Sequence, residues 1–125
     1  MPTMTDATTI VRDFCAAWES RDQGLILASF TDDAIYHNIP MAPVQGKEAI
    51  KGLLAIILGP ASAVSFEIKH IVADGDVVLT ERLDTFKMGD KAVALPVMGT
   101  FELRDGKIAA WRDYFDLATW TKQAG

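Results

Sequence analysis

The chain has 125 residues, half of them apolar, and a formal net charge of −5. This length and composition predict one compact domain over residues 1–125 with a sizeable core, and exclude a disordered chain. Because 17 acidic residues outnumber 12 basic ones and no Lys/Arg cluster occurs, we expect neither nucleic acid nor an anionic membrane surface as a partner.

Cys15 is the single cysteine, so no intrachain disulfide and no cysteine-based zinc site are expected, which fits the reducing cytoplasm. The N-terminal segment has no basic stretch followed by an apolar run. The longest apolar stretch, residues 53–58, is too short to cross a bilayer. We therefore expect neither export by that route nor a membrane span.

Helical patterns fill most of the first half of the chain. The apolar stripe of the first predicted helix has helical spacing: Ile10, Phe14, Ala17 and Trp18. A short second helix is predicted over residues 23–30. A third is predicted over residues 47–58, where Gly59 and Pro60 give a strong stop signal.

Strand patterns dominate the second half of the chain. Runs rich in β-branched and aromatic residues predict strands over residues 64–73, 77–87, 92–103 and 107–116. Gly-containing turns separate these runs, so the four strands should form an antiparallel meander. A further short strand, residues 34–39, lies between the helices. Helices placed before such a sheet indicate an α+β fold, in which the sheet curves over the helices.

Two predicted strands carry charged residues on an otherwise apolar face. Arg82 and Asp84 share a strand face with Phe86, but the pattern alone does not say which face is buried, and by itself it favours a solvent-facing Arg–Asp pair. Asp113 lies between Trp111 and Phe115, where an ionised carboxylate is costly without a partner. Arg82 is the candidate partner, and backbone amides are the alternative.

The short strand places Tyr36 and Asn38 on one face, where their donors and acceptors could hold a water molecule. His37 points to the other face and is typical of a surface histidine. With His70 as the only other histidine, a metal site has little support.

Considered together, three segments resemble the active-site segments of the limonene-1,2-epoxide hydrolase family, within the NTF2-like and SnoaL-like superfamily. They are Tyr36-x-Asn38 followed by Pro40, Thr80-Glu81-Arg82-x-Asp84, and Gly106-Lys107-Ile108-x-x-Trp111-Arg112-Asp113-Tyr114-Phe115-Asp116. The resemblance runs from the first helix to about Trp120. It implies a cone formed by a strongly curved mixed sheet, wrapped by the N-terminal helices around a deep apolar pocket, and a homodimer. An apolar outer strand face with Leu79, Leu83 and Tyr114 would suit such a dimer.

The resemblance also assigns roles. It implies that Asp113 is the general base and Asp84 the general acid, that Arg82 bridges them, and that Tyr36 and Asn38 hold the nucleophilic water with Asp113. The partners implied are a small apolar epoxide and water, with no metal or organic cofactor. The matching pocket positions, for which ordinary core is the alternative, are Cys15, Trp18, Ile57, Phe86, Leu95, Val97, Trp111, Phe115 and Trp120.

Opening an epoxide requires a proton on the departing oxygen and a deprotonated water at carbon. One positive charge on Arg82 neutralises one ionised carboxylate, so in a dry pocket the second aspartate should keep its proton. That division allows one aspartate to act as base and the other as acid in a single step. The sequence lacks the parallel βαβ alternation and nucleophile elbow of the α/β-hydrolase type, which acts through an ester intermediate.

Two other functions occur in the same superfamily. Ketosteroid isomerase-like enzymes and SnoaL-like polyketide cyclases move a carbon-bound proton and stabilise an enolate with neutral donors. Arg82 argues against this chemistry, because an arginine between two carboxylates suits paired acid and base work. A noncatalytic NTF2-like ligand-binding module is the remaining alternative.

Overall fold

The computed structural model describes residues 6–125, so part of the N-terminal segment considered for export lies outside the described residues. Within residues 6–125, no helix is long and apolar enough to span a membrane. In chain order the elements are α1 (Ala7–Ser20), α2 (Gln23–Ala28), β1 (Phe30–Asn38), β2 (Val44–Gln45), α3 (Lys47–Leu58), β3 (Ala63–Asp74), β4 (Val77–Met88), β5 (Lys91–Arg104), β6 (Lys107–Tyr114) and α4 (Leu117–Ala124).

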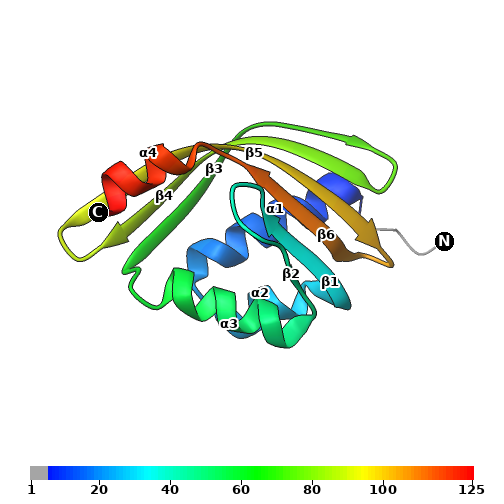
Figure 1. The fold of residues 1–125 in the computed structure, drawn as a ribbon. Helices are drawn as coiled ribbons and strands as arrows, with labels where there is room; N and C mark the ends of the chain where they lie inside the picture. Colours follow the sequence, from blue (N-terminus) through cyan, green and yellow to red (C-terminus); the bar gives the residue numbers. More distant parts are fainter. Residues whose placement is uncertain (1–5) are drawn as a thin grey trace.

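The strands form one sheet in the order β2-β1-β6-β5-β4-β3, which arches over α1, α2 and α3 (Figure 1). The neighbours from β3 to β6 pair antiparallel and confirm the predicted meander. The β1 strand pairs parallel with β6, so the sheet is mixed, as the resemblance implies. The α+β fold with a curved sheet over N-terminal helices is confirmed.

Local sequence explains the helix ends. Asp6 caps α1, because its side chain accepts a hydrogen bond from the backbone N–H of Thr9 at 2.8 Å. The Arg21 residue ends α1 in the left-handed conformation, and its N–H donates to the carbonyl of Trp18. The α3 helix has the predicted bounds.

The second helix is shorter than predicted. The α2 helix ends at Ala28, and Phe30 begins β1, where it pairs with Ile108 of β6. The Phe30 ring is fully buried and packs edge-on against Phe14 at a centroid distance of 5.4 Å. Pairing with a distant strand therefore overrides the local helical pattern of residues 23–30.

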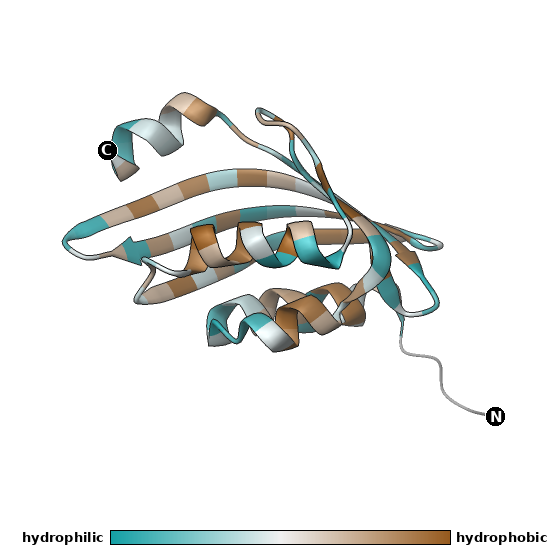
Figure 2. Cartoon of the chain, turned by 60° about the horizontal axis from the view of Figure 1, so that its bottom comes forward, coloured by the Kyte–Doolittle hydropathy of each residue, from teal (hydrophilic) through white to brown (hydrophobic). Residues whose placement is uncertain are grey.

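The predicted strand over residues 107–116 ends two residues early, because Asp116 precedes a fourth helix. The Asp116 carboxylate accepts a hydrogen bond from the Thr119 hydroxyl at 2.7 Å. The α4 helix lies at one end of the sheet, apart from the other helices (Figure 2). The Gln123 side chain attaches it to β5 by accepting from the backbone N–H of Ala94 at 2.8 Å and donating to its carbonyl at 2.9 Å.

Hydropathy alternates along the long strands (Figure 2). The inner face of β4 is buried and carries Val78, Thr80, Arg82, Asp84 and Phe86. The outer positions between them are exposed or half-buried. The charged residues that broke the sequence pattern are therefore on the core side of the sheet.

Candidate active site

One row of residues crosses the middle of the sheet. Asn38 of β1 pairs with Asp113 of β6, Asp113 pairs with Gly99 of β5, and Gly99 pairs with Thr80 of β4. Arg82 lies one inward-facing position further along β4 and is also buried. The parallel β1–β6 pairing thus brings residues 36–38 beside Asp113, although about 75 positions separate them in the sequence.

The guanidinium of Arg82 is completely paired. Its Nε donates to Oδ1 of Asp84 at 3.0 Å, and Nη2 donates to Oδ2 of Asp84 at 2.8 Å and to Oδ2 of Asp113 at 2.7 Å. Nη1 donates to Oγ1 of Thr80 at 3.1 Å and to Oδ1 of Asp113 at 3.3 Å. All five N–H groups have acceptors, and the Arg82 cation lies 4.9 Å from the centroid of the Phe66 ring.

Asp113 has a second fixed donor. The indole Nε1 of Trp111 donates to its Oδ1 at 2.6 Å. The Trp111 ring is in turn stacked on the ring of Tyr36, with centroids 4.2 Å apart and planes 3° from parallel. Both carboxylate oxygens of Asp113 therefore accept hydrogen bonds from fixed N–H groups, an arrangement that suits a proton acceptor.

Opposing effects act on the pKa of Asp84. Burial raises the pKa of Asp84 to about 6, and the negative charge of Asp113 adds to that rise, while the hydrogen bonds and charge of Arg82 oppose it. Burial acts to lower the pKa of Arg82, but the two carboxylates outweigh burial and raise that pKa well above its ordinary value. The cation is thus permanent, and Asp84 can carry a proton near neutral pH.

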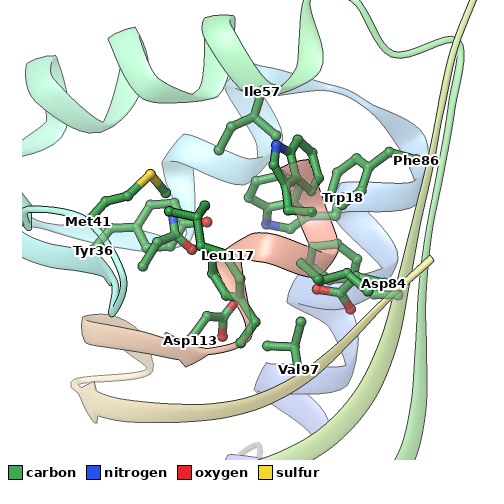
Figure 3. Close-up of a pocket in the computed structure, with 14 residues that line it drawn as sticks. Trp18, Tyr36, Met41, Ile57, Asp84, Phe86, Val97, Asp113 and Leu117 are labelled. Atoms are coloured by element: carbon green, nitrogen blue, oxygen red, sulfur yellow. The ribbon is translucent and has the colours of Figure 1, made fainter. Parts of the chain in front are cut away.

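Arg82, Asp84 and Asp113, the triad, lie at one side of a mostly apolar cavity, into which the two carboxylates open. In Figure 3, Ile57 extends from α3 on one side of the cavity, and Asp84, Val97 and Asp113 lie on the opposite side. Among the described residues that line it, four are polar or charged: Tyr36, Asn38, Asp84 and Asp113. The apolar walls are Trp18, Met41, Ile57, Phe66, Phe86, Leu95, Val97, Phe115, Leu117 and Trp120.

Two predicted wall residues do not line the cavity. Cys15 is buried in the core, and burial raises the pKa of its thiol to about 12. Trp111 is fully buried behind the cavity, where it contacts Asp113. The other predicted wall residues lie at the cavity surface, and Arg82 lies behind the two carboxylates that do.

Sequence patterns missed three wall residues. Phe66 occupies an inward position of β3, and alternation along that strand could have identified it. Met41 lies in the turn after β1, and Leu117 begins the unpredicted α4. Nothing in the local sequence marks these two positions as part of a site.

The remaining titratable candidates lie elsewhere. Nε2 of His37 lies 2.8 Å from the carbonyl of Met41, and His70 lies 3.7 Å from Glu81 in a mostly exposed pair. Over residues 6–125, no group of three or more His, Cys, Asp or Glu side chains is placed to hold a metal ion.

The raised pKa of Asp84 should be visible in the stability of the protein. Since the pKa rises from 3.8 to about 6 on folding, the folded protein keeps a proton that the unfolded chain has released. Stability from this group is therefore lost as pH rises through that interval. Asp84→Asn cannot titrate, so between about pH 4 and pH 7 the parent should lose roughly 3 kcal/mol of unfolding free energy relative to the variant.

Urea denaturation at several pH values measures this difference, with Asp90→Asn in the β4–β5 turn as the control for loss of a surface carboxylate. A parent-to-variant difference that stays constant across the interval contradicts the raised pKa.

Comparison with known proteins shows the family of this chain. The family model of the limonene-1,2-epoxide hydrolase catalytic domain matches residues 5–124. Epoxide hydrolase EphG of Mycobacterium tuberculosis is 38% identical over 109 residues, which cover 86% of this chain and 71% of that protein. The structure of an LEH-like epoxide hydrolase from M. tuberculosis has a TM-score of 0.84 at 35% identity, covering 98% of this chain and 91% of the other.

A structure described as a SnoaL-like polyketide cyclase, from Shewanella putrefaciens, also has a TM-score of 0.84, at 18% identity and covering 98% of each chain. That likeness shows the NTF2-like and SnoaL-like fold alone. The fold is therefore common to several kinds of protein, and the match of sequence over residues 5–124 separates them. This chain belongs to the limonene-1,2-epoxide hydrolase family.

Proposed function

We propose that the protein is an epoxide hydrolase that adds water to a small apolar epoxide, cyclic or terpenoid, to give a vicinal diol in one step. The observation that carries the proposal is the single guanidinium of Arg82 shared by two buried carboxylates. One positive charge is balanced by one ionised aspartate. The other aspartate is most stable when protonated, which provides an acid and a base at the same pH.

The proposed step conserves atoms and charge. The oxygen of a water molecule attacks an epoxide carbon, and the water proton moves to Asp113. The carbon–oxygen bond of the ring breaks, and its oxygen takes the proton of Asp84. Afterwards Asp113 is protonated and Asp84 ionised, so the triad keeps its total charge, and one proton must return from Asp113 to Asp84 before the next turnover.

Tyr36 and Asn38 would place the attacking water. Both are buried and share the inner face of β1, and Asn38 is the direct strand partner of Asp113. Burial raises the pKa of Tyr36 above its ordinary value, so its phenol stays a neutral donor. A water bound by these two side chains would lie beside the carboxylate that accepts its proton.

The cavity walls support an apolar substrate. Apart from the four polar or charged residues of the site, every lining residue is apolar, five of them aromatic. Such walls favour a hydrocarbon skeleton and leave a charged group without a partner. Cyclohexene oxide and limonene 1,2-epoxide are therefore suitable test substrates, and an epoxy acid is the matched poor substrate.

Oxygen-18 labelling tests the direct attack of water. In a single turnover with enzyme in excess and oxygen-18 water, the label should enter the diol at once, because no enzyme oxygen is transferred. Mass spectrometry of the diol measures it. An unlabelled diol from the first turnover would show a carboxylate nucleophile, and no diol from any epoxide would remove the proposed activity altogether.

Substitution separates the two acidic roles. Asp113→Asn and Asp84→Asn each keep the side-chain shape but remove one proton-transfer group, so kcat should fall by about 10²–10⁴-fold for each. Asp90→Asn should keep the parental rate. In enolate chemistry with Asp113 as the only base, Asp84→Asn would retain activity, and that result would favour the isomerase-like alternative.

We also propose that two copies associate through the outer face of the sheet. The helices α1, α2 and α3 cover the inner face, whereas Met98 and Tyr114 are 52% and 46% exposed on the outer face and pair across β5 and β6. Leu79 and Leu83 of β4 lie on the same face, on either side of Glu81, the strand partner of Met98, and these strands are central rather than at an edge. Exposed apolar side chains on such a face are typical of an isologous interface.

Light scattering tests the dimer. The parent should have the mass of two chains at micromolar concentration, and Met98→Glu should shift it towards one chain by placing a charge in the interface. Ile56→Glu is the control, since Ile56 is exposed on α3, on the other side of the molecule. A monomeric parent, or a dimer that Met98→Glu leaves intact, would overturn this proposal.

A further inference from the structure

Gly99 occupies the centre of the row that crosses the sheet, between Asp113 on one side and Thr80 on the other. It lies inside β5, and it is not one of the glycines with positive φ. Its backbone conformation is therefore open to any residue. Glycine is unfavourable inside a strand, so its presence there calls for another explanation.

The triad provides that explanation. A Cβ atom on residue 99 would lie 2.4 Å from Nη1 of Arg82, 2.7 Å from Oδ1 of Asp113 and 3.0 Å from Oγ1 of Thr80. All three distances are at or below the closest approach that a carbon atom tolerates. The guanidinium thus passes directly over the α-carbon of Gly99 to reach a carboxylate two strands away.

These side-chain ends have little freedom to move aside. All five N–H groups of Arg82 are bonded, and Oδ1 of Asp113 is also held by Trp111. Any shift that makes room for a methyl group at residue 99 must lengthen at least one of these bonds. In a buried site the lost bonds are not replaced by water.

We infer that Gly99 is a positioning residue, which holds Arg82 across Asp113 by having no side chain, and that Thr80 assists by accepting the remaining Nη1 hydrogen bond. Neither residue lines the cavity, so both act through Arg82 rather than on substrate. The effect on turnover rests on the proposed epoxide hydrolysis. The effect on the geometry of Arg82 does not.

The first test compares Gly99→Ala with Gly52→Ala. A Cβ on Gly52, in α3, would have no atom within 4 Å, so this variant is the matched control for adding a methyl group. For Gly99→Ala we expect kcat to fall by roughly 100-fold, as for other small displacements of catalytic groups, with KM changed less than about threefold, because the cavity walls are intact. The control should keep both constants.

Two variants of Thr80 test the inference even if Gly99→Ala does not fold. Thr80→Ser keeps the hydroxyl acceptor, whereas Thr80→Val keeps the shape and leaves an N–H of the buried guanidinium without a partner. We expect kcat to fall about tenfold for Thr80→Val and to be near the parental value for Thr80→Ser. Equal rates for the two variants would overturn the role of Thr80.

Nitrogen-15 NMR of the Arg82 side chain gives a readout independent of activity. In the parent, the fully bonded guanidinium should give separate, slowly exchanging Nη proton signals, assigned by their absence from Arg82→Lys. Gly99→Ala should broaden or merge these signals, and Gly52→Ala should not. Unchanged signals and a parental kcat in Gly99→Ala would overturn the inference. Changed signals in a protein that hydrolyses no epoxide would support the positioning and contradict only the proposed function.

Discussion

The rest of the structure depends on a buried positive charge. Arg82 is 1% exposed, and removing such a charge from water costs several kcal/mol unless it is paired and fully hydrogen-bonded. Its acceptors are Thr80 and Asp84 on its own strand, β4, and Asp113 on β6. The β5 strand, with Gly99, lies between β4 and β6. The register of β4, β5 and β6 therefore also determines the geometry of the site, since a shift of one residue would turn these side chains to the outer face.

That single charge also accounts for the division of roles. Two carboxylates that share one cation cannot both ionise without leaving a buried negative charge unpaired. The donors around them are unequal: Asp113 is held by Arg82 and Trp111, whereas Asp84 is held by Arg82 alone, and burial raises its pKa to about 6. In the proposed mechanism, these asymmetric surroundings would give two identical side chains opposite tasks.

The fold contributes a separation between polar and apolar surfaces. The sheet presents the polar side chains of the site, while α1, α3 and α4 contribute the apolar Trp18, Ile57 and Trp120. The structure from Shewanella putrefaciens, at 18% identity, shows that this fold is shared beyond close sequence relatives. In the proposed function the chemistry would reside in a few inward positions of β1, β4 and β6.

Elements with strong local patterns could be predicted from the amino-acid sequence. The bounds of α3, the presence of strands β3 to β6, and the three charged residues on apolar strand faces all followed from periodicity, turn residues and the cost of burying charge. Local pattern left open whether the Arg82–Asp84 face was buried, and the resemblance, rather than periodicity, grouped Tyr36 and Asn38 with Asp113.

The remaining features depend on contacts between distant parts of the chain. The parallel pairing of β1 with β6, the start of β1 at Phe30, the docking of α4, and the clearance that Gly99 gives to Arg82 each join segments far apart in the chain. Secondary-structure propensity reflects only residues that are close in sequence, whereas these contacts stabilise the fold only when distant strands are already in register.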